Sequence, residues 1–165
     1  MIRTNEISFS YKEFDTPGEL NPDDRELLIF AQKAALNAYA PYSQFRVGAA
    51  VRLQSGKIIT GTNVENAAFP SGICAERNAL STASANHPGD VPAVIAIAAF
   101  TGEGLTDDTV SPCGNCRQVI AEEEYRNSKT IRIILGGSKK IRIIEKGEDL
   151  LPLQFNRDNL KITPR

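Results

Sequence analysis

The sequence predicts an α/β fold in which helices cover both faces of a mixed β-sheet. Helical and strand-like patterns alternate along the chain, which favours a three-layer α/β/α sandwich. Residues 93–100 are almost wholly apolar, as in a strand that is buried on both faces. At 165 residues, the chain can bury a core without disulfide support. We therefore expect one domain over residues 1–165, with residues 1–20 as an extension to which the sequence assigns no role.

The first half of the chain predicts an edge strand, a helix and a pair of strands. Residues 6–14 alternate apolar and polar side chains, which indicates a short exposed or edge strand. The segment 21–24 reads Asn-Pro-Asp-Asp and is typical of a helix start, with a capping side chain, proline in the first turn and acids at the positive end of the dipole. This helix should end before Pro41. Residues 46–53 and 57–64 predict two strands around a Ser-Gly turn.

The second half predicts two helices and three strands. Helical patterns cover residues 74–86 and 114–125, and the buried strand at 93–100 lies between them. Two further strands are expected at 130–135 and 140–145.

Charge and hydropathy argue against several classes of function. Nineteen basic and twenty acidic residues give a net charge of −1, whereas affinity for nucleic acid depends heavily on basic residues that neutralise phosphates. The short basic cluster at 139–142 is interpreted as the start of a strand with solvated charges. No apolar run approaches the roughly 20 residues that cross a bilayer, and the first residues lack the apolar core of a signal peptide. We expect a cytoplasmic protein that binds neither nucleic acid nor membranes.

All three cysteines lie in two short motifs. Cys74 begins a Cys-Ala-Glu motif, and Cys113 and Cys116 belong to a Pro-Cys-Gly-Asn-Cys motif. Three thiolates leave one corner of a tetrahedral zinc open for water, which is the pattern of a catalytic site, and both motifs lie at predicted helix starts that favour thiolates. Glu76 is close to the metal but poorly placed to ligate it, which indicates acid–base chemistry in a hydrolysis. The sequence thus predicts one zinc per chain, with Arg77 offsetting the excess negative charge.

Two other interpretations of the cysteines remain open at this point. His87 could complete a structural zinc site, although it lies in a turn at the far end of the predicted helix. Cys113 and Cys116 could form a redox pair, but that interpretation leaves Cys74 and Glu76 unexplained. Because the cysteine count is odd and the spacing is typical of a metal site, we expect a reducing compartment.

Five segments resemble, in order, the small homotetrameric cytidine deaminases that carry an all-cysteine zinc site. These enzymes belong to a superfamily in which a glutamate shuttles protons and Pro-Cys-x-x-Cys supplies ligands. The resemblance implies a cytidine deaminase-like fold, a homotetramer, and deamination of cytidine and 2′-deoxycytidine to uridine and 2′-deoxyuridine with release of ammonia, as in pyrimidine salvage. It spans residues 25–155, and its segments are 40–50, 61–67, 72–77, 111–119 and 149–155.

The resemblance also implies roles beyond zinc binding by the three cysteines and proton transfer by Glu76. Asn63 and Glu65 would hydrogen-bond the ribose 3′-hydroxyl; from residue type alone, they could instead cap their own loop. Phe45 would pack against the pyrimidine, and the Ala75 N–H would contact the ring carbonyl. Phe155 would reach a neighbouring subunit's site. From residue type alone, both phenylalanines are expected in the core.

Two positions depart from the family pattern, and three rival functions remain. Phe69 stands where the family often has Tyr, which removes a hydroxyl that could reach a neighbouring site, and Asn78 stands where Thr is common. The rivals are a deaminase of another cytosine-bearing molecule, a nucleic-acid editor of the same superfamily, and a non-catalytic module stabilised by zinc.

Overall fold

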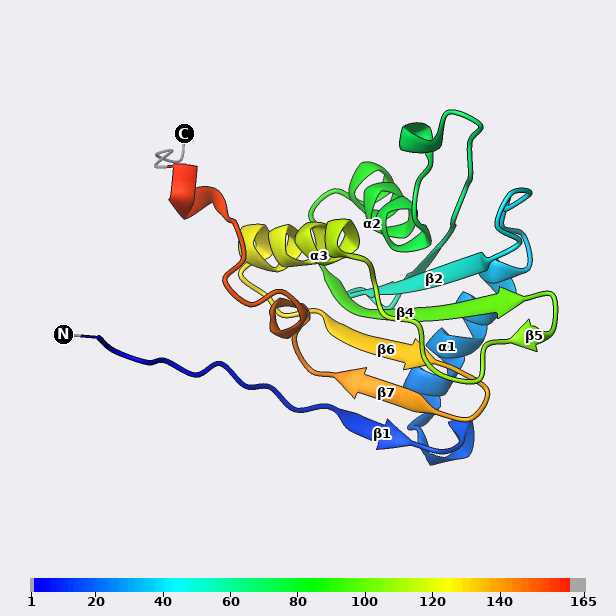
Figure 1. The fold of residues 1–165 in the computed structure, drawn as a ribbon, viewed down its shortest axis with the longest axis horizontal. Coiled ribbons are helices and arrows are strands. Elements are labelled where there is room, and N and C mark those ends of the chain that lie inside the picture. Colours follow the sequence, from blue (N-terminus) through cyan, green and yellow to red (C-terminus); the bar gives the residue numbers. More distant parts are fainter. Residues whose placement is uncertain (1, 161–165) are drawn as a thin grey trace.

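The computed structural model describes residues 2–160 of the chain. These residues form a seven-stranded sheet with three α-helices packed on it (Figure 1). The strands are β1 (Lys12–Phe14), β2 (Arg46–Leu53), β3 (Ile58–Thr62), β4 (Pro92–Thr101), β5 (Gly104–Leu105), β6 (Arg132–Gly136) and β7 (Ile141–Ile144). The helices are α1 (Pro22–Ala35), α2 (Ala75–Asn86) and α3 (Gly114–Asn127). Short 3₁₀ helices lie at Pro17–Glu19, Phe69–Ser71, Gly147–Leu150 and Arg157–Leu160.

The sheet is mixed, as predicted. Its order is β1-β7-β6-β4-β2-β3, and β5 pairs with the end of β4. Only the pairing of β4 with β6 is parallel among the described strands. A parallel pair needs a crossover connection, and α3 provides it. Its first turn therefore starts beside the sheet, close to the start of α2.

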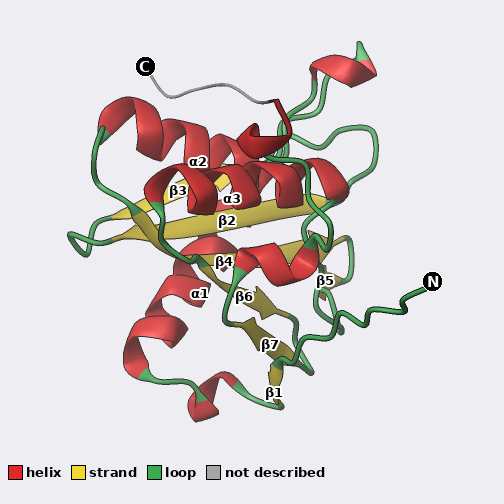
Figure 2. Cartoon of the chain, turned by 90° about the vertical axis from the view of Figure 1, so that its left-hand side faces the viewer, coloured by secondary structure: helices red, strands yellow, loops and turns green. Residues whose placement is uncertain are grey.

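Helices cover both faces of the sheet, which confirms the layered prediction. Figure 2 shows α2 and α3 on one side of the sheet and α1 on the other. Side chains on β4 alternate accordingly: Ile95 and Ile97 belong to the core cluster under α2, and Ala96 and Ala98 belong to the cluster against α1. The central strand is thus buried on both faces, as its apolar run indicated.

Helix α1 begins as predicted. The Oδ1 atom of Asn21 accepts a hydrogen bond of 2.9 Å from the backbone N–H of Asp24, which satisfies one free donor of the first turn. The helix ends at Ala35, well before Pro41. Strand β2 has the bounds that the pattern predicted.

The predicted strand over residues 6–14 was wrong in its extent. Only Lys12–Phe14 pair with β7, in a register that sets Lys12 opposite Ile143. Strand β7 ends at Ile144, which this register sets opposite Tyr11, so residues before Tyr11 run past the end of β7. Strand β5 and the 3₁₀ helices were not predicted, because segments of two to four residues carry no measurable periodicity.

A close approach between β3 and α2 positions the first cysteine motif. A Cβ atom at Gly61 would lie 2.5 Å from the Ala79 nitrogen and 2.6 Å from the Ala75 carbonyl oxygen. Only glycine leaves room for the helix at this distance. The start of α2 is therefore held directly against the strand that leads to Asn63 and Glu65.

Candidate active site

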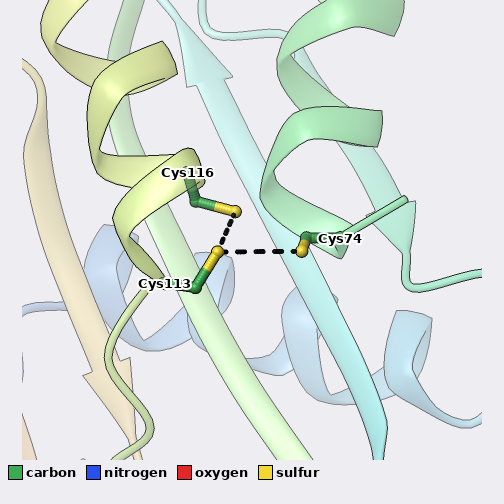
Figure 3. A group of neighbouring side chains, drawn as sticks. All are labelled: Cys74, Cys113 and Cys116. Atoms are coloured by element: carbon green, nitrogen blue, oxygen red, sulfur yellow. Dashed lines mark hydrogen bonds between the residues drawn. The ribbon is translucent and has the colours of Figure 1, made fainter. Parts of the chain in front are cut away.

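The three cysteine sulfurs converge between the starts of α2 and α3. Cys74 is the N-cap of α2, Cys113 is the N-cap of α3, and Cys116 lies in the first turn of α3. Figure 3 shows their side chains pointing toward one another. The Sγ atom of Cys113 is 3.9 Å from that of Cys74 and 3.5 Å from that of Cys116, and all three lie within 4.8 Å of one another. Zinc–sulfur bonds of about 2.3 Å put the sulfurs of a tetrahedral site about 3.8 Å apart, so this group fits zinc.

The electrostatics of the three thiols also suit a cation. Burial raises the pKa of Cys74 and of Cys116, and the negative charge of Glu76 raises both further. Burial opposes ionisation of Cys113 as well, but hydrogen bonds from the backbone N–H and the side chain of Cys116 lower its pKa overall. Crowded thiolates become stable when a dication offsets their charge.

Glu76 lies in the first turn of α2 with its side chain directed into the protein. Its exposed fraction is 5%. Burial raises the pKa of its carboxyl group above the ordinary value, and the Cys116 side chain opposes that rise. A carboxyl group with a raised pKa beside a metal site is suited to accept and return a proton.

A cavity of about 560 Å³ opens beside the cysteines. Four predicted site residues line it: Cys74, Arg77, Asn63 and Glu65. The cavity therefore joins the first cysteine motif to the end of β3, two regions that the sequence places apart. Its other lining residues are Tyr42, Ser43, Val64, Asn66, Phe69, Pro70, Gly72, Ile73 and Asn115.

Asn63 is held by the backbone of the neighbouring strand. Its Oδ1 atom accepts a hydrogen bond of 2.7 Å from the Val47 N–H, and its Nδ2 atom donates one of 2.9 Å to the Phe45 carbonyl oxygen. Because an amide nitrogen carries two hydrogens, one Nδ2–H remains for another acceptor. The Asn63 side chain is thus bound to the backbone around the start of β2 and not to its own loop, and one donor is left over.

Glu65 is held by the loop before β2. Its Oε2 atom accepts hydrogen bonds from the backbone N–H groups of Tyr42, at 2.8 Å, and Ser43, at 3.3 Å, and the Ser43 hydroxyl donates to Oε1. The Ser43 hydroxyl and these N–H groups lower the pKa of Glu65. The carboxylate therefore stays ionised near neutral pH and presents acceptors to the cavity.

Of the remaining predicted residues, Ala75, Phe45 and Phe155 are not among the residues that line the cavity. Ala75 is fully buried, and because it is the first residue of α2, its N–H has no acceptor within the helix. Phe45 is half-buried. Phe155 is 58% exposed, so the expectation that it belongs to the core was wrong. Arg77 lines the cavity, and its side chain has no hydrogen bond or ion pair to another residue between positions 2 and 160.

Two positions that depart from the family pattern have distinct surroundings. Phe69 is 91% exposed at the cavity rim. Asn78 donates a hydrogen bond of 3.1 Å to the Thr62 carbonyl oxygen and so ties α2 to the end of β3. A threonine hydroxyl is shorter and carries a single hydrogen.

His87 does not belong to the metal group. It is the C-cap of α2, and twelve helical residues separate it from Cys74 by about 18 Å at 1.5 Å per residue. The interpretation that His87 completes a structural zinc site was therefore wrong. Among residues 2–160, the three cysteines are the group that could hold a metal ion.

Sequence reasoning missed two side chains that support the site. Ser43 holds Glu65, as described above. Arg117 donates from Nε to the Pro112 carbonyl oxygen at 2.8 Å and from Nη1 to the Leu150 carbonyl oxygen at 3.0 Å, which secures the approach to Cys113. Both lie inside segments that resemble the family, but a hydroxyl and a guanidinium have no metal-site signature.

Within residues 2–160, no helix is both long enough and apolar enough to span a bilayer.

Comparisons with known proteins agree with the geometry. The family described as "Cytidine and deoxycytidylate deaminase zinc-binding region" matches residues 21–131. A cytidine deaminase of Halalkalibacterium halodurans is 45% identical over 139 residues, which cover 83% of this chain and 98% of that protein. One from Mycobacterium tuberculosis is 36% identical over 135 residues, which cover 79% of this chain and 87% of that protein.

Solved structures show the same likeness. The crystal structure of a cytidine deaminase from Burkholderia pseudomallei superposes with a TM-score of 0.66 at 39% identity, covering 79% of this chain and 97% of that one. The cytidine deaminase from Mycobacterium tuberculosis superposes with a TM-score of 0.64 at 29% identity, covering 82% of this chain and 99% of that one.

Proposed function

Because the chain belongs to the cytidine and deoxycytidylate deaminase family, we propose that its three-cysteine site and Glu76 carry out its chemistry. The activity is the zinc-dependent, hydrolytic deamination of cytidine to uridine with release of ammonia. We extend it to 2′-deoxycytidine and to a role in pyrimidine salvage. One observation supports the assignment most: three sulfurs that fit zinc lie near a buried carboxyl group, and one of them, that of Cys74, belongs to a residue that lines a cavity of about 560 Å³.

Cys74, Cys113 and Cys116 would hold the zinc. When bound, zinc lowers the pKa of a water molecule and so supplies a hydroxide nucleophile at neutral pH. Glu76 would accept a proton from the attacking water and deliver it to the ring nitrogen next to carbon 4 as the water oxygen bonds to that carbon. It would then accept the proton that remains on this oxygen and deliver it to the amine, which leaves as ammonia while carbon 4 becomes a carbonyl. Its buried environment supports this role, because burial raises the pKa of Glu76 toward the operating pH, where a carboxyl group can both accept and deliver a proton.

Asn63 and Glu65 would bind the ribose 3′-hydroxyl together. A hydroxyl group is both donor and acceptor; the free Nδ2–H of Asn63 satisfies its oxygen, and the ionised Glu65 accepts its hydrogen. An anionic Glu65 also repels a phosphate at this position. Asn63 and Glu65 therefore argue against a nucleic-acid editor, because every internal 3′-oxygen of a nucleic-acid strand carries a phosphate.

The other assignments concern the base, the metal charge and the assembly. Phe45 would pack against the pyrimidine, the Ala75 N–H would bind the ring carbonyl, and Arg77 would offset the negative charge of three thiolates. Phe155 is exposed in the single chain, which supports a role in a neighbouring site of a homotetramer. We place the enzyme in the cytoplasm.

The direct test is the loss of ultraviolet absorbance from a panel of nucleosides, with metal analysis of the same sample. We expect one zinc per chain and turnover of cytidine and 2′-deoxycytidine. Zinc without ammonia release from cytidine would favour the non-catalytic module, and submicromolar binding of labelled oligonucleotides at moderate salt would favour the editor.

Replacing Glu65 by Gln tests recognition of the sugar. We expect kcat/KM for cytidine to fall by about 10-fold to 100-fold, as for loss of a hydrogen bond to a charged group, while deamination of free cytosine changes little. Equal losses for both compounds would favour a deaminase of another cytosine-bearing molecule.

A further inference from the structure

We propose that Arg142 is a positioning residue for the zinc site, because it ties the N-terminal edge strand to the loop that delivers Cys113. Arg142 lies on β7, the strand next to the edge strand β1. Arg142 belongs to none of the five segments that resemble the family. Two of its contacts, Tyr11 and Glu13, lie before residue 21, where the family match begins.

Arg142 contacts two separate parts of the chain at once. On the N-terminal side, its Nε atom lies 2.8 Å from the Glu13 carboxylate, and its guanidinium lies over the Tyr11 ring at 5.6 Å from the centroid. On the other side, its Nη1 atom donates to the Thr109 hydroxyl at 2.7 Å and lies 3.2 Å from an oxygen of Asp108. We call these five residues the Arg142 cluster.

The loop that the cluster holds connects β5 to α3 and ends at Cys113. Figure 1 shows it running past the carboxyl end of β6 before it reaches α3. Its first half is fixed to the β6–β7 turn, because the Ser138 N–H donates to Thr106 and the Lys139 N–H donates to Asp107. Only three residues lie between Thr109 and Cys113.

Two arginines thus hold the approach to Cys113 from opposite ends. Arg117 fixes the Pro112 carbonyl at the helix end of the loop, and Arg142 fixes Thr109 and Asp108 at the far end. The planar guanidinium of Arg142 carries five N–H donors and can contact both parts of the chain at once, whereas a lysine ammonium is a compact point charge. Groups that do not bind the metal but hold its ligands in position contribute to metal affinity. The N-terminal segment therefore acts on the metal centre through Arg142.

The test compares rates of zinc release from the full-length, zinc-loaded protein into excess chelator. Arg142→Ala should release zinc about 10-fold faster, the lower end of what loss of a group supporting a metal ligand costs. Thr109→Val, which removes one hydroxyl at similar size, should act in the same direction. The combined variant should release zinc no faster than Arg142→Ala alone, because both changes remove the same contact.

Lys12→Ala is the matched control. Lys12 lies on β1, the strand that also carries Glu13. Its ammonium group pairs with the Glu145 carboxylate at 2.8 Å, but this pair makes no contact with the loop before Cys113. Its zinc-release rate should stay within about twofold of wild type, because exposed ion pairs contribute little. Melting temperatures of the metal-free variants separate general loss of stability from loss of metal retention.

Two results would overturn the inference: equal release from Arg142→Ala and Lys12→Ala, or effects of Arg142→Ala and Thr109→Val that multiply in the combined variant. If Arg142→Ala does not fold, Thr109→Val alone tests the inference. A zinc-release rate equal to that of the wild type would then reject a role for the hydrogen bond between Arg142 and Thr109. A wild-type chain that bound no zinc would reject the zinc site itself, and this inference with it, before any variant is compared.

Discussion

Individual side chains near the cysteines are prepared for opposite charge states. Glu76 is buried, which raises its pKa, and Glu65 accepts hydrogen bonds from Ser43 and Tyr42, which lower its pKa. One carboxyl group is thereby suited to exchange protons, and the other to remain an anion. The environment, rather than the residue type, separates the two roles.

Replacing Glu76 by Gln tests the proton-transfer role. We expect zinc content to stay at one per chain, because the three sulfurs are untouched, while kcat for cytidine falls by about 10² to 10⁴-fold, the scale of a positioned acid–base group. Metal analysis and steady-state kinetics on the same sample check both expectations. Retention of most of the turnover would rule out the role that we assign to Glu76.

At the scale of elements, two helix starts and one strand end create the site. Helices α2 and α3 bring their cysteines together because both lie on the same face of the sheet. Gly61 lets α2 approach β3, and Asn78 then ties the helix to the Thr62 carbonyl. Cys74 and the two residues that we propose to bind the sugar, Asn63 and Glu65, therefore line the same cavity.

Gly61→Ala should disturb this contact and loosen the metal. Its new methyl group would collide with the backbone of α2, so we expect the free energy of unfolding to fall by about 1–3 kcal/mol, as for overpacking, and zinc release to accelerate. Chemical denaturation and chelator competition measure the two effects.

Gly48→Ala is the control for that experiment. A Cβ atom there would lie 2.1 Å from the Ala31 carbonyl oxygen of α1, on the opposite face of the sheet. It should destabilise the fold similarly without a matching change in zinc release. If both variants lose zinc equally, general instability explains the loss.

At the scale of the whole molecule, several apolar side chains remain uncovered around the cavity and the C-terminal segment. Tyr42, Phe69, Leu153 and Phe155 are all exposed. Leu153 also has a positive φ of 57°, a conformation that a leucine rarely adopts. Phe155 is held at its backbone, because Gln118 donates to its carbonyl oxygen at 2.8 Å. These features are consistent with the homotetramer that we propose.

Mixing two inactive variants tests whether Phe155 serves a neighbouring site. Phe155→Ala alone and Glu76→Gln alone should each have low activity. Mixed assemblies should regain activity, because a site with an intact Glu76 can receive Phe155 from a Glu76→Gln subunit. Light scattering should give a mass of four chains. Activity that never exceeds the average of the two variants would show that Phe155 acts within its own chain or not at all.

Much of the fold could be predicted from local patterns. The start of α1, the bounds of β2 and the doubly buried β4 follow from capping, alternation and an apolar run, which are properties of neighbouring residues. The edge strand at residues 6–14 was overestimated, because its length depends on where β7 ends. No property of those nine residues contains that information.

The sequence by itself determined the chemistry: three thiols and a spare carboxyl group, in motifs that place them at helix starts. Only the tertiary structure decided how these groups are held. It brings the Cys74 sulfur beside that of Cys113, sets Glu65 against Ser43 and joins Arg142 to the loop before the second motif. The physical reason is that residue types and spacing carry local chemistry, whereas distances between remote segments follow from strand order and packing, which the whole chain sets together.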